Sequence, residues 1–183
     1  EKEIDHSKNM INILYNKKRS IPKKYETIRS NYSSIATKGF DIISNQFSLH
    51  YYFKNEKTLR TYLENISNAC KKGGYFIGTC YDGNRILELF GDQNIIEYTK
   101  NSETVYKLEK IDISDFKYNK ENIKNMFGNS INVYMDSIGK TFEEYLVHFE
   151  FFIDIMKEYG FEPALPTFHK GEYNPIKQPI ESF

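Results

Sequence analysis

The sequence of 183 residues contains little cysteine and no tryptophan. Cys70 and Cys80 are its only cysteines, too few for a disulfide scaffold or for a tetrahedral zinc site of the usual kind. No stretch reaches the roughly 18 consecutive apolar residues that a membrane-spanning helix needs, and the first residues do not resemble a signal peptide. From these absences we expect a soluble protein in a reducing, intracellular compartment, namely the cytoplasm.

An excess of charge of one sign is also lacking, because Lys+Arg and Asp+Glu are equal at 25 each. No strong overall field attracts nucleic acid, so any RNA contact has to be local. One positive cluster stands out, residues 17–19 (KKR) with Lys23 and Lys24. It could bind phosphates. A solvated helix end is an equal alternative, because cations favour the last turn of a helix.

The sequence motifs of hydrolases and kinases are absent as well. Neither a GxSxG elbow nor a Walker loop occurs. The histidines are not next to serine or cysteine in a recognisable nucleophile elbow; they are His6, His50, His148 and His169. These two classes of enzyme are therefore excluded.

The residues that are present predict one α/β domain, with 39% hydrophobic and 16% aromatic content able to form a real core. An apolar run at residues 40–47 predicts a buried strand. Apolar residues recur three or four apart over residues 57–71, which predicts a helix that ends at Gly73 and Gly74. The next strand is expected at residues 75–79. Strand, helix and strand in this order predict a parallel sheet with a right-handed crossover.

The other elements are predicted from periodicity and from capping residues. We expect helices over residues 7–19, over residues 82–90 with Asp82 as N-cap, and over residues 142–159, closed by Gly160. We expect antiparallel strands at residues 103–113 and 131–135, and a last strand from Phe161. Residues 21–38 are expected to be mostly loop with at most a short strand, and the proline-rich tail is expected to be loop.

Polar and aromatic side chains alternate where the first strand of the parallel sheet ends. Open parallel sheets bind ligands outside the carboxyl ends of their strands, and residues 44–53 (SNQFSLHYYF) leave the sheet there. Such a segment can stack a flat ring and hydrogen-bond its rim. The alternative is that these aromatic residues only close the top of the core.

Two further segments are candidates for the same site. Residues 79–83 (TCYDG) end the second strand and can supply a pocket wall, although Asp82 and Gly83 suit an ordinary turn and helix cap equally well. Glu143 and Glu144 are expected in the first turn of the last helix, where carboxylates normally complement the helix dipole. Their functional interpretation is recognition of a guanine edge, because one carboxylate can accept hydrogen bonds from N1 and N2 together.

Residues 39–53 (GFDIISNQFSLHYYF) resemble the signature of mRNA cap guanine-N7 methyltransferases. Residues 73–79 (GGYFIGT) and 144–149 (EYLVHF) follow in family order and resemble a strand and a helix start of these enzymes. The resemblance covers about residues 39–160. It implies an α/β, Rossmann-like class I S-adenosylmethionine-dependent methyltransferase, with a mostly parallel sheet flanked by helices and a small antiparallel insertion. Residues 1–183 would form one partial domain.

The resemblance also implies roles for residues that match the family motifs. Gln46 and Tyr51 would line the S-adenosylmethionine pocket, and His50 and Tyr51 would form walls of the cap guanine site. Glu144 would accept hydrogen bonds from the guanine edge. Because guanine N7 already carries a lone pair, no catalytic acid or base is expected, and these residues would act by positioning and electrostatics.

Two more roles come from the amino-terminal part. Residues 4–7 (IDHS) resemble the family segment whose acidic residue holds the cofactor ribose, so Asp5 is the candidate. Arg19, after the first helix, would correspond to the arginine that faces the cap phosphates. The family's glycine-rich motif and its C-terminal strand are not found, so we expect a chain truncated at both ends.

The function implied by the resemblance is methyl transfer from S-adenosylmethionine to N7 of the 5′ cap guanine during mRNA capping. Residues 79–83 look closer to the capping enzymes of poxvirus-like and other large DNA viruses. The expected partners are the capped 5′ end of mRNA and other capping-enzyme domains or a small stimulatory subunit, with no membrane. The alternatives are a non-catalytic methyltransferase-like module of a capping complex and a small-molecule methyltransferase of the same fold.

Overall fold

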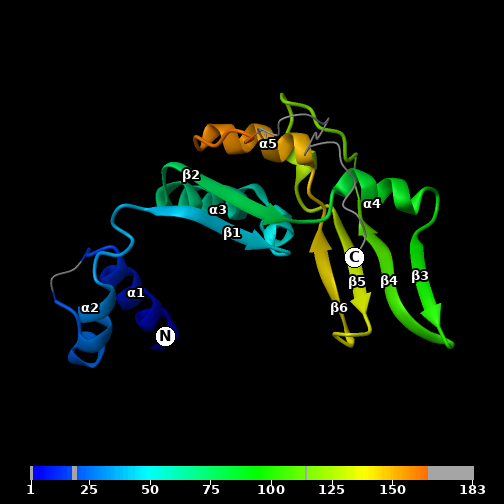
Figure 1. The fold of residues 1–183 in the computed structure, drawn as a ribbon. Helices are drawn as coiled ribbons and strands as arrows, with labels where there is room; N and C mark the ends of the chain where they lie inside the picture. Colours follow the sequence, from blue (N-terminus) through cyan, green and yellow to red (C-terminus); the bar gives the residue numbers. More distant parts are fainter. Residues whose placement is uncertain (1, 18–19, 114, 165–183) are drawn as a thin grey trace, which may run out of the picture.

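A parallel pair of strands forms the centre of the protein in the computed structural model (Figure 1), which describes residues 2–17, 20–113 and 115–164. β1 (Phe40–Gln46) and β2 (Cys70–Thr79) are joined by η2 (Leu49–Lys54) and α3 (Glu56–Ala69). This confirms the predicted strand–helix–strand unit. The expected burial of the first strand was wrong, because five of the seven residues of β1 are exposed and β2 is its only partner strand within the described residues.

The glycine pair lies inside β2 and does not end α3, so the predicted start of this strand at residue 75 was wrong. The helix already ends at Ala69. The pairing with β1 then shifts, and residues 71–74 form a bulge between the pairs Phe40–Cys70 and Ile42–Tyr75. A Cβ at Gly74 would lie 2.9 Å from the Phe40 carbonyl oxygen, so this close approach of two backbones requires glycine.

A second, antiparallel sheet follows, with strand order β3-β4-β5-β6. Its strands are β3 (Ile95–Lys100), β4 (Glu103–Asp112), β5 (Ser130–Met135) and β6 (Lys140–Tyr145). The predictions for β4 and β5 are confirmed, whereas β3 and β6 were not predicted. The α/β, Rossmann-like fold class is also confirmed, but with four strands the antiparallel part is larger than the two strands expected.

The predicted helix over residues 142–159 was wrong in its first part. Residues 140–145 form β6, and the helix, α5 (Phe149–Glu158), starts after it. Register pairs run from Ser130–Tyr145 to Met135–Lys140, so pairing with β5 overrides the local helical periodicity. Glu144 therefore projects from a strand and not from a first helical turn.

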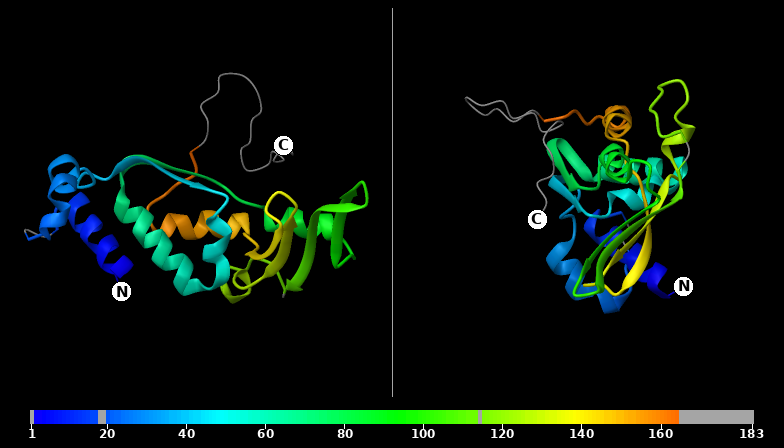
Figure 2. Two further views of the ribbon diagram at one scale, coloured as in Figure 1. Left: turned by 90° about the horizontal axis from the view of Figure 1, so that it is seen from below. Right: turned by 90° about the vertical axis from the view of Figure 1, so that its right-hand side faces the viewer.

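The amino-terminal part is more helical than predicted. α1 (Lys2–Leu14) begins before Ser7 and ends before residue 15, and the expected loop contains η1 (Lys23–Tyr25) and α2 (Glu26–Tyr32). Backbone amides of Ser34 and Ala36 donate to carbonyls at the end of α1, a tertiary contact that periodicity cannot reveal. Figures 1 and 2 show both helices at the amino end of β1.

Three predictions concern the remaining segments. α4 (Gly83–Phe90) is confirmed, and the Asp82 carboxylate accepts a hydrogen bond of 3.0 Å from the Asn84 amide as its N-cap. Gly160 follows α5 with φ 84°, as expected of a residue that closes a helix. The strand predicted from Phe161 was wrong, because residues 161–164 form no strand. Arg19 and residues 165–183 lie outside the described residues.

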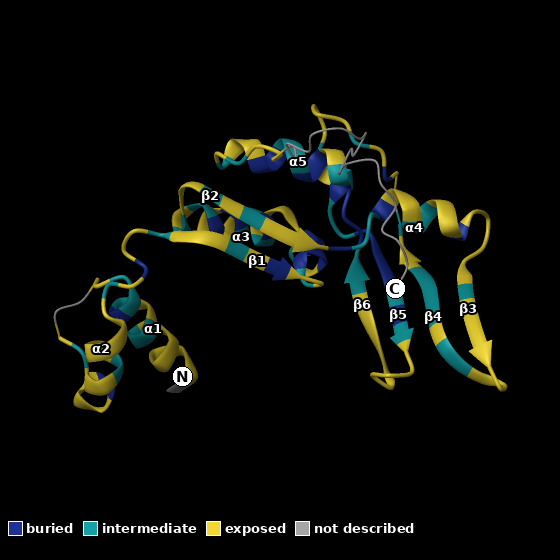
Figure 3. Ribbon diagram, viewed as in Figure 1, coloured by how far each residue is buried: buried dark blue, intermediate teal, exposed yellow. Residues whose placement is uncertain are grey.

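Two buried clusters meet where the sheets join. The larger one packs η2 and α3 against α5, and the smaller one packs α4 against the antiparallel sheet. A bridge between Asp82 and Val147 links the end of β2 to the end of β6. Figure 3 shows buried residues concentrated at this junction. η3 (Lys124–Met126) contributes Met126 to the larger cluster. Among the helices of the described part, none is long and apolar enough to cross a membrane.

The larger cluster provides a test of the fold. Phe53 is fully buried, and its ring lies 6.3 Å from that of Phe151. We expect Phe53→Ala to lower the free energy of unfolding by about 3–5 kcal/mol in urea denaturation, because it leaves a cavity. The matched control is Phe47, which is 64% exposed; Phe47→Ala should change stability by less than about 0.5 kcal/mol. Equal losses in both variants would contradict this description of the core.

Candidate functional site

The segment after β1 directs a histidine toward the antiparallel sheet. Leu49 and Phe53 of η2 are buried in the larger cluster, and this fixes His50 between them. His50 is only 3% exposed, and its Nε2 lies 3.6 Å from Oε2 of Glu144 on β6. The packing of η2 against β6 thus brings together a histidine and a glutamate from distant parts of the chain.

Two tyrosines complete the group around this pair. The Tyr51 ring lies 4.2 Å from the His50 ring, centre to centre, and Tyr51 is 46% exposed. The Tyr81 ring, from the segment after β2, lies 6.3 Å from the His50 ring at an angle of 29°. We refer to His50, Tyr51, Tyr81 and Glu144 as the His50–Glu144 cluster. It combines flat aromatic surface with one carboxylate.

The polar atoms at the centre of the cluster are buried without hydrogen bonds. Both ring nitrogens of His50 and Oε2 of Glu144 have no hydrogen-bond partner among the described residues, and 3.6 Å is too long for a bond between them. Burial lowers the pKa of His50 and raises the pKa of Glu144. An effective ion pair would shift both pKa values the other way, so the cost of burial outweighs any attraction between the two charges.

Tyr81 has its phenol held in the protonated form. Burial, and after it the nearby Glu144 carboxylate, raises the pKa of Tyr81. The cluster therefore holds a neutral imidazole, a protonated phenol and a carboxylate without its full set of donors. Buried polar groups are nearly always paired, so this arrangement is typical of a site that a polar, flat ligand completes.

Gln46 lies at the carboxyl edge of the parallel strands, as expected. It is opposite Thr79 in the register, and the Thr79 hydroxyl donates a 2.8 Å hydrogen bond to its side-chain oxygen. The Gln46 amide nitrogen donates to the Ser44 hydroxyl at 3.0 Å. No hydrogen bond within the described ranges joins Gln46 to the His50–Glu144 cluster. The carboxyl edge of β1 and β2 thus presents the Gln46 amide and the Thr79 hydroxyl. Both residues are close to members of the cluster in the sequence, but they form a separate group.

The structure does not bring Asp5 to this edge. Asp5 is exposed on α1, and its carbonyl oxygen accepts a hydrogen bond from Asn9. α1 packs with α2 at the amino end of β1, whereas Gln46 is at the carboxyl end (Figure 1). The role of Asp5 at the cofactor ribose stays a prediction.

Tyr81 was named within a candidate segment but received no role. Its position at a strand end, directly before the N-cap Asp82, was the available signal in the sequence.

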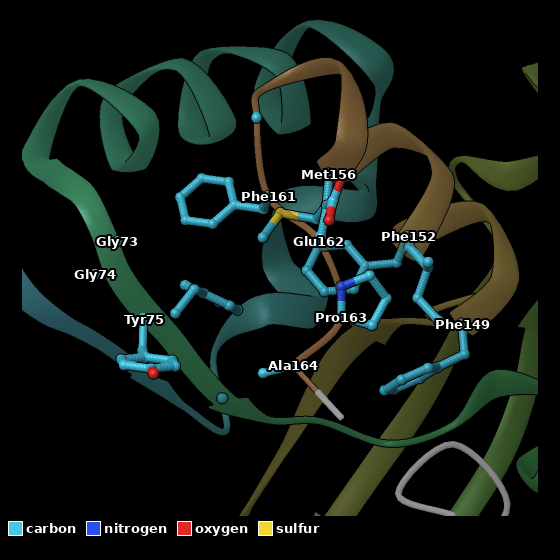
Figure 4. Close-up of a pocket in the computed structure, with 14 residues that line it drawn as sticks. Gly73, Gly74, Tyr75, Phe149, Phe152, Met156, Phe161, Glu162, Pro163 and Ala164 are labelled. Atoms are coloured by element: carbon cyan, nitrogen blue, oxygen red, sulfur yellow. The ribbon is translucent and has the colours of Figure 1, made fainter. Parts of the chain in front are cut away.

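A pocket of about 590 Å³ lies elsewhere, between β2 and α5 (Figure 4). Figure 4 shows side chains of α5 and of residues 161–164 facing β2. Its larger apolar lining residues are Tyr75, Phe76, Phe149, Phe152, Met156 and Phe161. None of the predicted site residues lines it, so the pocket is not part of the candidate site. Among the described residues, no group of three or more His, Cys, Asp or Glu could hold a metal ion.

The chain is similar in sequence to mRNA cap guanine-N(7) methyltransferases. The sequence model of the mRNA (guanine-N(7))-methyltransferase domain matches residues 15–175. The mRNA cap guanine-N(7) methyltransferases of Eremothecium gossypii and Saccharomyces cerevisiae are each 30% identical over 78% of this chain, covering 34% and 33% of those proteins. That of Candida albicans is 30% identical over 73% of this chain and 29% of its own length. The chain spans about a third of the length of these relatives.

The unpaired carboxylate leads to a prediction about stability. Because the pKa of Glu144 is raised above 4.5, the folded state keeps the proton to higher pH than the unfolded state. Protonation of Glu144 therefore stabilises the folded state fully below pH 4.5, and this stabilisation is lost as the pH rises through the raised pKa of Glu144. We expect Glu144→Gln to increase the free energy of unfolding at neutral pH by about 1 kcal/mol, since it removes a buried charge.

Urea denaturation of both proteins at several pH values checks this. The difference between them should shrink as the pH falls, because the wild-type carboxyl group then becomes protonated and neutral like the amide. A Glu144→Gln protein that is less stable than the wild type at neutral pH would show that the carboxylate has a stabilising partner in the folded chain.

Proposed function

The chain belongs to the mRNA (guanine-N(7))-methyltransferase domain family, and from this premise we propose that it takes part in methyl transfer from S-adenosylmethionine to N7 of the mRNA cap guanine. The observation that carries the proposal is the His50–Glu144 cluster, with its buried polar atoms that lack hydrogen bonds. Its substrate would be the capped 5′ end of mRNA. The likeness to large DNA virus enzymes stays a prediction, because the relatives compared are fungal.

The cluster fits guanine in both shape and hydrogen bonding. A guanine edge presents two adjacent donors, N1–H and N2–H, and the Glu144 carboxylate can accept both at once. This would give the buried Oε2 the partner that it lacks in the chain. The rings of Tyr51 and Tyr81 both lie beside the ring of His50, the neighbour of that carboxylate, and offer flat surface for the purine.

Residues at the carboxyl edge of β1 and β2 are suited to the cofactor. The Gln46 amide and the Thr79 hydroxyl are exposed there, at the edge where open parallel sheets bind their ligands. We assign Gln46 and Tyr51 to S-adenosylmethionine, which supplies an electrophilic methyl group when bound. The chain's own part is to hold the two ligands next to each other and to keep water away from them.

The histidine has a positioning role in this proposal. Burial lowers the pKa of His50, so the imidazole stays neutral at physiological pH. Guanine N7 needs no deprotonation, because its lone pair is already available, so no proton has to move to His50. Its tight packing between Tyr51 and Glu144 instead fixes the walls of the guanine site. Beyond the capped mRNA, we propose other capping-enzyme domains or a small stimulatory subunit as partners, and the cytoplasm as the location.

Glu144→Ala provides the test of the guanine site. We expect it to reduce kcat/KM for capped RNA about 100-fold or more, because two hydrogen bonds to a charged acceptor are lost. The Kd of S-adenosylmethionine should change less than about threefold. The measurements are methyl transfer from labelled cofactor and equilibrium binding, on the full-length protein. The control is Glu143→Ala on the same strand, because the Glu143 carboxylate accepts a hydrogen bond from the Ser130 hydroxyl on the other face of the sheet.

Three outcomes would contradict the proposal. Equal losses of cap use and cofactor binding in Glu144→Ala would mean that the residue supports the fold and not the guanine. A full-length protein without saturable S-adenosylmethionine binding would point instead to a non-catalytic module of a capping complex. Methylation of small molecules but not of capped RNA would replace the substrate.

Gln46→Ala tests the cofactor side. It removes the amide at the strand edge and leaves the His50–Glu144 cluster intact, so we expect S-adenosylmethionine binding to weaken about tenfold. The Kd of a cap dinucleotide should change less than about twofold. Gln93→Ala, at another exposed glutamine, is the matched control and should bind both ligands normally. Weakened cap binding with normal cofactor binding in Gln46→Ala would reverse the assignment.

A further inference from the structure

A row of exposed side chains crosses all four strands of the antiparallel sheet. Tyr98 on β3 pairs with Tyr106 on β4, Tyr106 pairs with Met135 on β5, and Met135 pairs with Lys140 on β6. Directly opposite residues of antiparallel strands share one face. Tyr98, Tyr106 and Met135 are 49%, 39% and 40% exposed. We call these four residues the tyrosine row.

The tyrosine row lies on the same face of the sheet as Glu144. Side chains two residues apart along a strand share a face, and Lys140, Phe142 and Glu144 alternate along β6. Phe142 pairs with Val133, and Glu144 pairs with Ile131. These pairs belong to the next two rows, which continue the same face of the sheet. The four residue steps from Glu144 to Lys140 span about 13 Å of extended strand. One surface thus leads from the proposed guanine site to the tyrosine row.

The aromatic rings of the row are open to ligands because α4 stops short of them. The smaller core cluster packs Ile86 and Leu87 of α4 with Leu108, Ile96 and Val133, one row closer to the helix. Beyond that row, the rings of Tyr98 and Tyr106 lie 5.7 Å apart at 22° to each other. They form an exposed, nearly flat platform of the kind on which unpaired bases stack.

The charge of this platform favours an anionic ligand such as nucleic acid over a cationic one. The row contains a lysine and no carboxylate, and Lys140 is exposed. On the opposite face of the sheet, Lys107 is paired with Glu109 at 3.9 Å. Since the net charge of the chain is zero, RNA contacts have to be local, and two stacked tyrosines with Lys140 in the same row, beyond Met135, form such a contact.

We propose that the tyrosine row binds unpaired bases of the transcript that directly follow the cap. The proposal rests on the proposed function for the position of the cap. The stacking itself does not depend on the cap, because every base has a flat face that aromatic side chains can stack on. The row would therefore bind single-stranded RNA with little sequence preference and would align the transcript along β6.

The test compares three ligands in equilibrium binding to the full-length protein: a cap dinucleotide, a capped single-stranded RNA, and the same RNA without cap. The double variant Tyr98→Ala/Tyr106→Ala should bind both RNAs about tenfold more weakly or worse, and the cap dinucleotide within about twofold of the wild type. Tyr32→Ala, at a tyrosine that is 50% exposed on α2, is the matched control and should bind all three normally.

Three more variants test whether the row itself contacts RNA. Tyr98→Phe/Tyr106→Phe keeps the flat rings, so RNA binding should be restored in this variant. This result would show that binding needs the rings and not the hydroxyl groups. The chain has no tryptophan, so Tyr106→Trp introduces one reporter, whose fluorescence should be quenched by uncapped RNA. Lys140→Gln should reduce the slope of log K for RNA binding against log salt concentration by about one.

The outcomes separate this proposal from the function on which it rests. If the cap dinucleotide does not bind but uncapped RNA binds through the row, the cap assignment fails and the row stands. If the double alanine variant binds both RNAs like the wild type, or if the tryptophan is not quenched, the row is not an RNA site. Equal weakening of all three ligands in that variant would also overturn it, because the defect would then be one of folding.

Discussion

The site depends on the burial of two side chains that point away from it. Leu49 and Phe53 are packed into the larger core cluster, and with η2 anchored in this way His50 lies against Glu144 of β6. The bridge between Asp82 and Val147 holds the end of β2 against the end of β6, which places Tyr81 next to the same point. Packing of apolar groups thus determines where the polar groups meet.

The close approach of His50 and Glu144 is unfavourable in the folded chain without a ligand. The buried imidazole of His50 and the buried Oε2 of Glu144 have no hydrogen bonds and destabilise the folded state, and burial shifts both pKa values so that the neutral forms are favoured. Structural polar groups in cores are normally satisfied. The lack of hydrogen bonds in this pair is therefore better explained by a ligand that supplies them than by a contribution to stability.

The sequence predicted the elements whose signals are local. β1, α3 and α4 follow from apolar periodicity and from caps such as Asp82, and each is confirmed. β6 and α2 were missed because they depend on partners far along the chain: β6 on pairing with β5, α2 on packing with α1. The roles of Glu144 and His50 came from family motifs, and Glu144 was placed in the wrong kind of element. Nothing local in the sequence could show that the two would lie 3.6 Å apart.

The same unpaired carboxylate explains how such a site would select guanine among purines. Adenine presents an acceptor at N1 and no amino group at C2, so its edge would face Glu144 with a lone pair and leave the buried oxygen unsatisfied. Sites built to hydrogen-bond a ligand reject analogues that lack the matching group far more strongly than apolar pockets do, because the buried polar group is left without a partner. Stacking on tyrosines cannot make this distinction, since every base has a flat face. Selectivity would therefore come from the buried acid, and general affinity for RNA from aromatic surface along the same sheet.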